Sequence, residues 1–202
     1  LFIPRERDYN VNEVVIDNDT KSDIKNKLYI ETGKKGGWKT CEQSGFAVGN
    51  PPYEENFNPF LSGTAKYTLS KLVPDSKIKW VINVPEIGEY TVYISYIAGI
   101  NNAKDVIYTI KHAGGTTEFK VNQTIGGNTW LYVGKFLFNK GDNNYIELSN
   151  KSNEEGKIIT ADAVRLGGGM GIVKRNGSTS GRPKFVEGAK YYMQYSGMPD
   201  TL

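Results

Sequence analysis

The segment KIKWVINVPEIGEYTVYISYI, residues 77–97, decides the fold class of this chain of 202 residues. On each side of a short connection that contains Pro85 and Gly88, apolar residues recur at every second position. A period of two is typical of strands that bury one face. The segment therefore predicts two antiparallel strands, over 77–84 and 89–97, joined by a tight turn.

The same pattern continues along the chain with short connections, which is the spacing of an antiparallel sandwich or barrel. Turns are predicted at Gly114–Gly115, at Gly126–Gly127 and at residues 141–144. The fold class that we expect is all-β, an antiparallel, jelly-roll-like β-sandwich. The further strands that we expect are Glu13–Asp17, Ala65–Leu69, two hairpin arms around Val106–Ile110 and Phe119–Val121, Trp130–Phe138, a strand through Ile146 and Leu148, and Lys157–Leu166.

Aromatic residues within these strands indicate which faces are buried. Trp130, Tyr132, Phe136 and Phe138 all occupy even positions and are predicted to lie on one side of their strand. Trp80 alternates with isoleucine and valine in the same way. We therefore predict that Trp80 and Trp130 pack in the core rather than contact a ligand.

Charge and composition limit the partners. The formal charge of +3 comes from lysines scattered among acids, without a basic run, so we expect no nucleic-acid partner. No stretch approaches the roughly 20 apolar residues of a membrane-spanning helix, so we expect no membrane insertion. The opening residues lack the order of a signal peptide, and we expect the chain to begin inside a longer protein or after processing. Cys41 and His112 are the only residues of their types, which excludes an internal disulfide and a two-histidine metal site within this chain.

The segment from Thr32 to Ser62 is rich in Gly, Pro and Asn around isolated aromatic residues, and we interpret it as a long surface excursion. Long loops often carry function. Sugar rings can stack on aromatic side chains there while their hydroxyls remain free to hydrogen-bond. The alternative is that these side chains form a small apolar cluster at one end of the sandwich. The aromatic residues in question are Trp38, Tyr53, Phe57 and Phe60.

Polar residues of the predicted hairpin offer a second ligand-binding hypothesis. His112 precedes the glycine turn, and Asn122 and Gln123 follow the opposite arm. Imidazole and amide groups suit contacts with sugar hydroxyls or a peptide. The alternative is that His112 stabilises its own turn by hydrogen bonds.

Three aspartates form a candidate metal site. Asp17 and Asp19 lie at the exit of the first strand, and Asp162 lies in the last long strand, which often runs beside the first in sandwiches. Carboxylate oxygens together with backbone carbonyls suit a structural calcium ion, although we expect no required cofactor. The alternative is a turn rich in Asp and Asn, with Asp162 paired to Arg165.

The character of the chain changes after Gly167. We interpret residues 170–182 as a linker and residues 183–202 as a helical segment, since Pro183 can begin a helix and apolar residues then share one helical face. This helix needs an apolar partner that the β-domain does not obviously supply.

Four segments together resemble the golvesin C-terminal-like domain, also called the xanthan lyase carbohydrate-binding-like domain, over residues 13–169. The segments are EVVIDND (13–19), YTIKHAGGTTEFKVNQ (108–123), NTWLYVGKFLF (128–138) and TADAVRLGGG (160–169). The resemblance implies a β-sandwich appended to, or inserted in, an extracellular enzyme directed at polysaccharide or peptidoglycan.

The two ends carry another resemblance. FIPRERD (2–8) and residues 182–195 are similar to a strand end and the following helix of zinc-dependent N-acetylmuramoyl-L-alanine amidases. This implies that residues 1–12 and 183–202 belong to a flanking hydrolase-like domain, with the β-sandwich inserted between them, as in large bacterial proteins often labelled xanthan lyase.

We therefore predict a non-catalytic carbohydrate- or cell-wall-binding module of a larger secreted hydrolase. Its partners would be polysaccharide or peptidoglycan and the flanking domain of the same chain, and its location extracellular, periplasmic or at the cell surface. One alternative is a structural insert that shapes the host enzyme without binding a ligand. Another is a fragment of an amidase-like catalytic domain that contributes Arg5, Asp8 or the helix beginning at Pro183.

Overall fold

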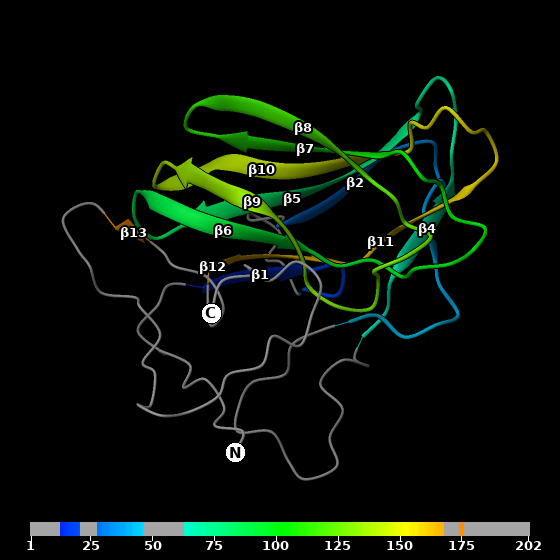
Figure 1. Ribbon diagram of the computed structural model, residues 1–202, viewed down its shortest axis with the longest axis horizontal. Coiled ribbons are helices and arrows are strands. Elements are labelled where there is room, and N and C mark those ends of the chain that lie inside the picture. Colours follow the sequence, from blue (N-terminus) through cyan, green and yellow to red (C-terminus); the bar gives the residue numbers. More distant parts are fainter. Residues whose placement is uncertain (1–12, 21–27, 47–62, 168–173, 176–202) are drawn as a thin grey trace, which may run out of the picture.

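The computed structural model describes residues 13–20, 28–46, 63–167 and 174–175, and in these residues all regular structure is β (Figure 1). Two five-stranded sheets lie face to face, with a smaller three-stranded sheet at one end. Every pairing between the named strands is antiparallel, which confirms the predicted all-β antiparallel sandwich. Within the described part of the chain no helix is long and apolar enough to cross a membrane. The predicted helix over 183–195 lies outside the described residues.

Sheet I contains the first strand and the last long strand side by side, as the sequence predicted. Strand β12 pairs with β1 on one edge and with β6 on the other, and β6 continues to β9 and to the short β13. The strands of sheet I are β1 (Glu13–Asp17), β6 (Gly88–Ile94), β9 (Leu131–Phe138), β12 (Ala163–Gly167) and β13 (Lys174–Arg175).

Sheet II has the order β2-β5-β10-β7-β8 and ends in the predicted hairpin, in which His112 pairs with Gly115. The small third sheet has the order β11-β4-β3. The strands of sheet II are β2 (Tyr29–Gly33), β5 (Ser76–Val84), β7 (Val106–His112), β8 (Gly115–Val121) and β10 (Gly141–Ser149), and those of the third sheet are β3 (Lys39–Thr40), β4 (Lys66–Leu69) and β11 (Ile158–Ala161).

The core fills the space between the two large sheets. Trp80 is fully buried as predicted, and its ring stacks on that of Tyr108 with 6.4 Å between centroids. Tyr90 of sheet I meets Phe138 edge-on at 6.1 Å. Burying one such side chain contributes on the order of 2 kcal/mol, so these alternating residues supply most of the drive to form the sandwich.

A β-bulge in β9 divides the aromatic residues of this strand between two faces, whereas the sequence predicted one face. Val92 pairs with Gly134 but Tyr93 pairs with Tyr132, so Val133 is an extra residue in the ladder. One extra residue reverses the alternation of side chains. Phe138 therefore faces the core, whereas Tyr132 and Trp130 belong to a second cluster outside it. The predicted burial of Trp130 is confirmed, but Trp130 packs in this second cluster and not between the two large sheets. The prediction that all four aromatic residues share one face is wrong because of the bulge.

The predicted single strand over 157–166 is in fact two strands in different sheets, and Asp162 lies at the break between β11 and β12. The backbone carbonyl of Asp162 accepts a hydrogen bond from the Asn18 amide at 3.2 Å. Its carboxylate oxygen Oδ2 accepts from the Phe46 amide at 2.9 Å and from the Ser95 hydroxyl at 2.6 Å. The break thus coincides with a buried carboxylate that binds donors from two distant parts of the chain.

Two other boundaries differ from the prediction. Residues 141–144, predicted as a turn, belong to β10, which contains an irregularity between Gly141 and Asn144. The Asn144 amide donates to the carbonyls of Asn139 and Gly141, so the side chain closes the connection while the backbone remains in the strand. The predicted excursion over 32–62 is partly structured, because β2 reaches Gly33, β3 follows, and Phe46 is buried.

Candidate functional site

The predicted aromatic platform is not supported by the residue that can be placed. Trp38 is only 7% exposed and packs with the main core. A buried indole offers no free face for a sugar ring. Its placement agrees with the alternative of an apolar cluster at the end of the sandwich. Tyr53, Phe57 and Phe60 lie outside the described residues.

The structure separates the polar residues that the hairpin hypothesis brought together. His112 lies at the turn, whereas Asn122 follows the far end of β8, about 20 Å away at the rise of a β-strand. The imidazole accepts from the Gly114 amide at Nδ1 (3.2 Å) and contacts the Thr117 hydroxyl at Nε2 (3.0 Å), so it stabilises its own turn. Asn122 closes a local turn by accepting from Thr124.

Gln123 is a core residue rather than a ligand-binding one. Its side chain is fully buried, with Nε2 donating to the Thr160 carbonyl at 2.8 Å and Oε1 accepting from the Thr160 amide at 2.9 Å. This pair of hydrogen bonds ties the loop after β8 to β11. No amide group of Gln123 is left to bind a ligand.

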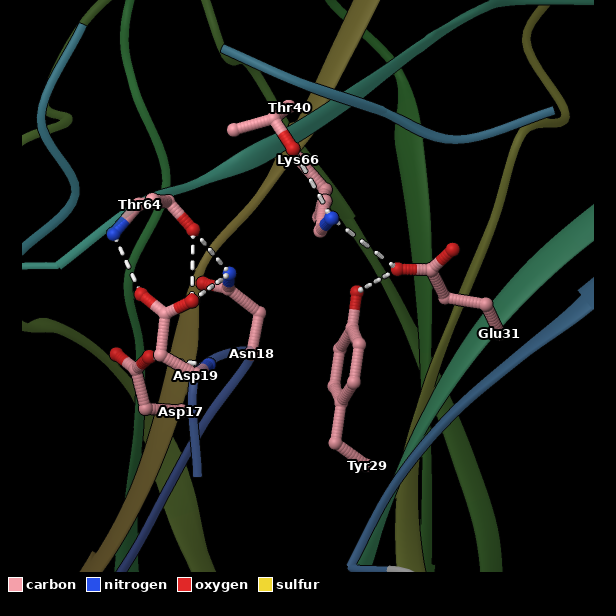
Figure 2. Close-up of polar contacts among 8 residues, drawn as sticks. All are labelled: Asp17, Asn18, Asp19, Tyr29, Glu31, Thr40, Thr64 and Lys66. Atoms are coloured by element: carbon pink, nitrogen blue, oxygen red, sulfur yellow. Dashed lines mark hydrogen bonds and ion pairs between the residues drawn. The ribbon is translucent and has the colours of Figure 1, made fainter. Parts of the chain in front are cut away.

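The three predicted metal-binding aspartates have different surroundings, and Figure 2 shows two of them, Asp17 and Asp19. Asp19 is engaged by Thr64, whose hydroxyl donates to Oδ1 at 2.8 Å and whose amide donates to Oδ2 at 2.5 Å. Asp17 accepts from the Asp19 amide at Oδ1, while its buried Oδ2 has no hydrogen-bond partner among the described residues. Burial raises the pKa of Asp17 to about 6. Asp19 is thus committed to Thr64, whereas one oxygen of Asp17 is left for another partner.

Asp162 is fully buried, and its Oδ1 atom has no hydrogen-bond partner among the described residues. Burial, together with the charge of Asp17, raises the pKa of this carboxyl to about 7. Among the described residues no group of three or more His, Cys, Asp and Glu side chains is close enough to hold a metal ion. The pair Asp17 and Asp162, together with backbone carbonyls, is what remains of the predicted calcium site.

A second polar group in Figure 2 joins β2, β3 and β4. Glu31 accepts from the Tyr29 hydroxyl at 3.1 Å and lies 3.9 Å from the Lys66 amine, which donates to the Thr40 hydroxyl at 3.1 Å. Burial, followed by the charge of Glu31, raises the pKa of Tyr29. These partners satisfy one another, so the group fastens the small sheet to sheet II.

The outward side of sheet I carries an aromatic cluster that we call the covered face, made of Phe46, Tyr93, Trp130, Tyr132 and Arg165. The ring of Phe46 meets Trp130 edge-on at 5.3 Å, and Tyr93 contacts Tyr132 at 5.6 Å. The Arg165 guanidinium lies 5.2 Å from the Tyr93 ring centroid and 5.9 Å from that of Trp130. Tyr93, Arg165 and Trp130 expose only 2%, 6% and 8% of their surface.

The outward side of sheet II carries a different set, which we call the open face, made of Lys77, Lys79, Lys111, Tyr145 and Glu147. The Lys79 amine lies 4.2 Å from the Tyr145 ring centroid and 3.4 Å from Glu147 Oε2, while Lys77 donates to Glu147 Oε1 at 2.8 Å. Our sequence reasoning did not identify these residues. The signal that could have found them is the polar half of the alternation over 77–84.

Comparison with known proteins gives a family match over most of the chain. The model of the Golvesin C-terminal domain matches residues 14–168. A xanthan lyase from Bacillus sp. (strain GL1) is 28% identical over 136 residues, which make up 66% of this chain and 13% of that protein. The chain thus spans about an eighth of the length of this relative.

A solved structure agrees with this match. A Paenibacillus xanthan lyase superposes with a TM-score of 0.56 and 25% identity, covering 76% of this chain and 13% of that one. A CBM35 from Cellvibrio japonicus Abf62 is more distant, with 19% identity and a TM-score of 0.37 over 73% of this chain and 96% of its own.

Proposed function

The chain belongs to the Golvesin C-terminal domain family, and we propose that it is a non-catalytic carbohydrate-binding module of a larger polysaccharide-directed enzyme. The observation that carries the proposal is the match to about an eighth of a xanthan lyase, an enzyme named for a polysaccharide. A module of that kind would act outside the cytoplasm, where such polymers occur. The flanking hydrolase-like domain that the chain ends resemble is part of the same proposal.

Binding by the module would keep the enzyme close to its polymer substrate. A module that holds the polymer keeps the linked catalytic domain at a high effective concentration of its substrate. Weak binding by the module suffices, because the gain comes from the linkage rather than from the affinity of one site.

The placement of three reactive residues supports a non-catalytic role. His112 is held within its own hairpin turn. Ser95 and Asp162 form a hydrogen bond of 2.6 Å, but both side chains are fully buried and out of reach of a polymer. A nucleophile and its base must meet the substrate directly.

The test is a binding experiment with two classes of polymer. Affinity electrophoresis through gels containing xanthan, and co-sedimentation with insoluble peptidoglycan, would measure retention of the purified chain. We expect retention by xanthan. Retention by peptidoglycan alone would show that the ligand is a cell-wall polymer. Retention by neither polymer would overturn the proposed function.

We also propose a structural calcium ion between Asp17 and Asp162. The support is a pair of buried oxygens, Asp17 Oδ2 and Asp162 Oδ1, that lack hydrogen-bond partners within the described part of the chain. Two buried carboxylates without a cation are costly, and hard cations favour such oxygen ligands. Calcium should raise the melting temperature of the wild type in scanning calorimetry, and the Asp162→Asn variant should lose this response. An equal response in both would overturn the site.

A structural insert remains the second candidate. If this candidate is correct, the chain binds no polymer, while its removal from the full-length enzyme lowers activity on a soluble substrate.

A further inference from the structure

The open face points to an anionic polysaccharide as the ligand, and we propose that Lys79, Lys111 and Tyr145 contact it. This inference rests on the proposed function and deepens it, since it names the surface and the chemical class of the glycan. The occupant is an extended chain that bears carboxylates, such as uronate residues.

Strand register places the three side chains next to one another. Tyr145 of β10 pairs with Lys111 of β7 on one side and with Val81 of β5 on the other, and Lys79 lies two residues before Val81. Directly opposed and diagonal residues on one face of a sheet lie within contact distance. Lys79 and Lys111 are on strands two apart, roughly 10 Å by the spacing of strands in a sheet. An extended sugar chain can reach both ammonium groups across the Tyr145 ring.

Lys79 is held in place before a ligand arrives. Its amine lies over the Tyr145 ring and beside Glu147. An ammonium group has three donors, so after these two contacts one donor remains for a ligand carboxylate. The Lys79 side chain is 35% exposed, so a ligand can reach it while the ring beneath limits its motion. A positioned cation loses less conformational entropy on binding than a freely moving lysine.

The net charge of this side of sheet II selects the class of glycan. Four lysines point outward from β5, β7 and β8, namely Lys77, Lys79, Lys111 and Lys120, against Glu118 and Glu147. Among the side chains of these strands that the structure describes, the difference is two positive charges, and Asp105, just before β7, offsets part of the charge of Lys120. A neutral glycan would not use this excess, whereas a polyanion would be attracted to it. Among the described elements none packs over this side of the sheet (Figure 1).

In addition to charge, the Tyr145 ring offers an apolar contact for a sugar. The Tyr145 ring is partly buried, so its position is fixed by packing. A pyranose can lie against the part of the ring that the Lys79 amine leaves uncovered, with the flanking ammonium groups pairing with its carboxylate. Lysines alone would attract any polyanion, and the ring adds the requirement for a sugar.

The experiment measures the affinity of the full chain for xanthan, for carboxyl-reduced xanthan and for a neutral β-glucan by affinity electrophoresis at two salt concentrations. We expect xanthan to bind, with an affinity that falls as salt rises, and the uncharged polymers to bind at least about ten-fold more weakly. The Lys79→Ala, Lys111→Ala and Tyr145→Ala variants should each weaken xanthan binding by about ten-fold, since each removes a charge-assisted hydrogen bond or the stacking surface. Lys135→Ala is the matched control, because it removes the same charge from sheet I.

The outcomes separate this inference from the proposed function. If the wild type binds xanthan and all three open-face variants bind equally well, the surface is wrong while the proposed function stands. If carboxyl-reduced xanthan binds as tightly as xanthan, the anionic class is wrong. If no polysaccharide binds, both fail. Circular dichroism and melting temperature would show that each variant is folded, so that lost binding is not lost structure.

Discussion

The outward faces of the two sheets are built from the same strand geometry but have opposite characters. On the covered face, Tyr93, Trp130 and Arg165 are nearly inaccessible and contact one another through ring faces and edges. On the open face, lysines alternate with core residues along β5, and Tyr145 is the aromatic residue among them. The side chains of the covered face are packed together, whereas those of the open face are charged and accessible to solvent.

This difference separates stability from recognition. Burying aromatic surface contributes free energy of folding in proportion to the area removed from water. Exposed ion pairs such as Lys77 with Glu147 contribute little to folding, but they set the field that an approaching ligand meets. Substitutions on the covered face should therefore change stability, and those on the open face should change binding.

The largest expected effect is on the covered face. Trp130→Ala should lower the free energy of unfolding by about 3–5 kcal/mol, because it removes a buried indole and leaves a cavity beside Phe46. Tyr145→Ala, the aromatic substitution on the open face, should cost clearly less. Urea denaturation followed by fluorescence or circular dichroism would measure both. Equal costs would contradict the contrast between the faces.

The second effect concerns Asp162, which fixes Phe46 at the edge of the covered face. Its folded-state pKa of about 7 lies above the ordinary value of 3.8, so the folded state favours the neutral acid. The stabilisation is fully present below about pH 4 and is lost as the pH rises through 7. Without calcium, the wild type should lose up to about 4 kcal/mol of stability across this range.

Asp162→Asn is the control for this pH dependence. The variant keeps an oxygen acceptor for Ser95 but cannot ionise, so its stability should vary much less with pH. Asp17 would account for a residual change near pH 6, since burial raises its pKa as well. Asp19, Cys41 and Tyr108 are the other titratable groups coupled to Asp162. Identical pH profiles of wild type and variant in chelator would contradict the assignment.

A third, smaller effect tests the bulge that places Tyr132 on the covered face. Gly134 has φ of 152°, and a Cβ there would lie 2.8 Å from Cε2 of Phe136. Gly134→Ala should therefore cost about 1–2 kcal/mol in urea denaturation, through backbone strain and the displaced ring. Gly141→Ala is the control, since its φ of 104° brings strain but no atom within 4 Å. A Gly134 variant no less stable than the Gly141 variant would show that Phe136 moves freely.

The period-two alternation was enough to predict the sandwich, the hairpin at Gly115 and the pairing of the first strand with the last. It failed at Val133 and at Asp162, and in both cases the reason is tertiary. A bulge reverses the inward and outward sides without changing the composition of the strand. A polar residue that breaks a strand is recognisable only when its partners, here Ser95 and Phe46 from distant parts of the chain, are known.

The site residues were harder to predict than the fold. Trp38 and Gln123 were chosen by residue type, yet burial decides whether such side chains can meet a ligand, and burial depends on neighbours far away in the sequence. The hairpin hypothesis failed because His112 and Asn122 are at opposite ends of β7 and β8. The outward residues of the open face could have been predicted, since they occupy the positions between the core residues of each strand. The pairing of Lys111 with Tyr145 could not, because it depends on which strands are neighbours and in which register.

The smallest expected change in stability comes from substitution of Glu147. This substitution is the most direct test of whether the open face affects binding and not stability. Glu147→Gln removes the acid shared by Lys77 and Lys79. The loss of these partly exposed ion pairs should cost less than about 1 kcal/mol in urea denaturation. Because the face gains one unit of positive charge while the Tyr145 ring still positions Lys79, binding of an anionic polysaccharide should become several-fold tighter at low salt. This gain should disappear as salt screens the face. Weaker binding in titration calorimetry would instead make Glu147 itself a ligand contact, and the excess of positive charge would no longer explain recognition.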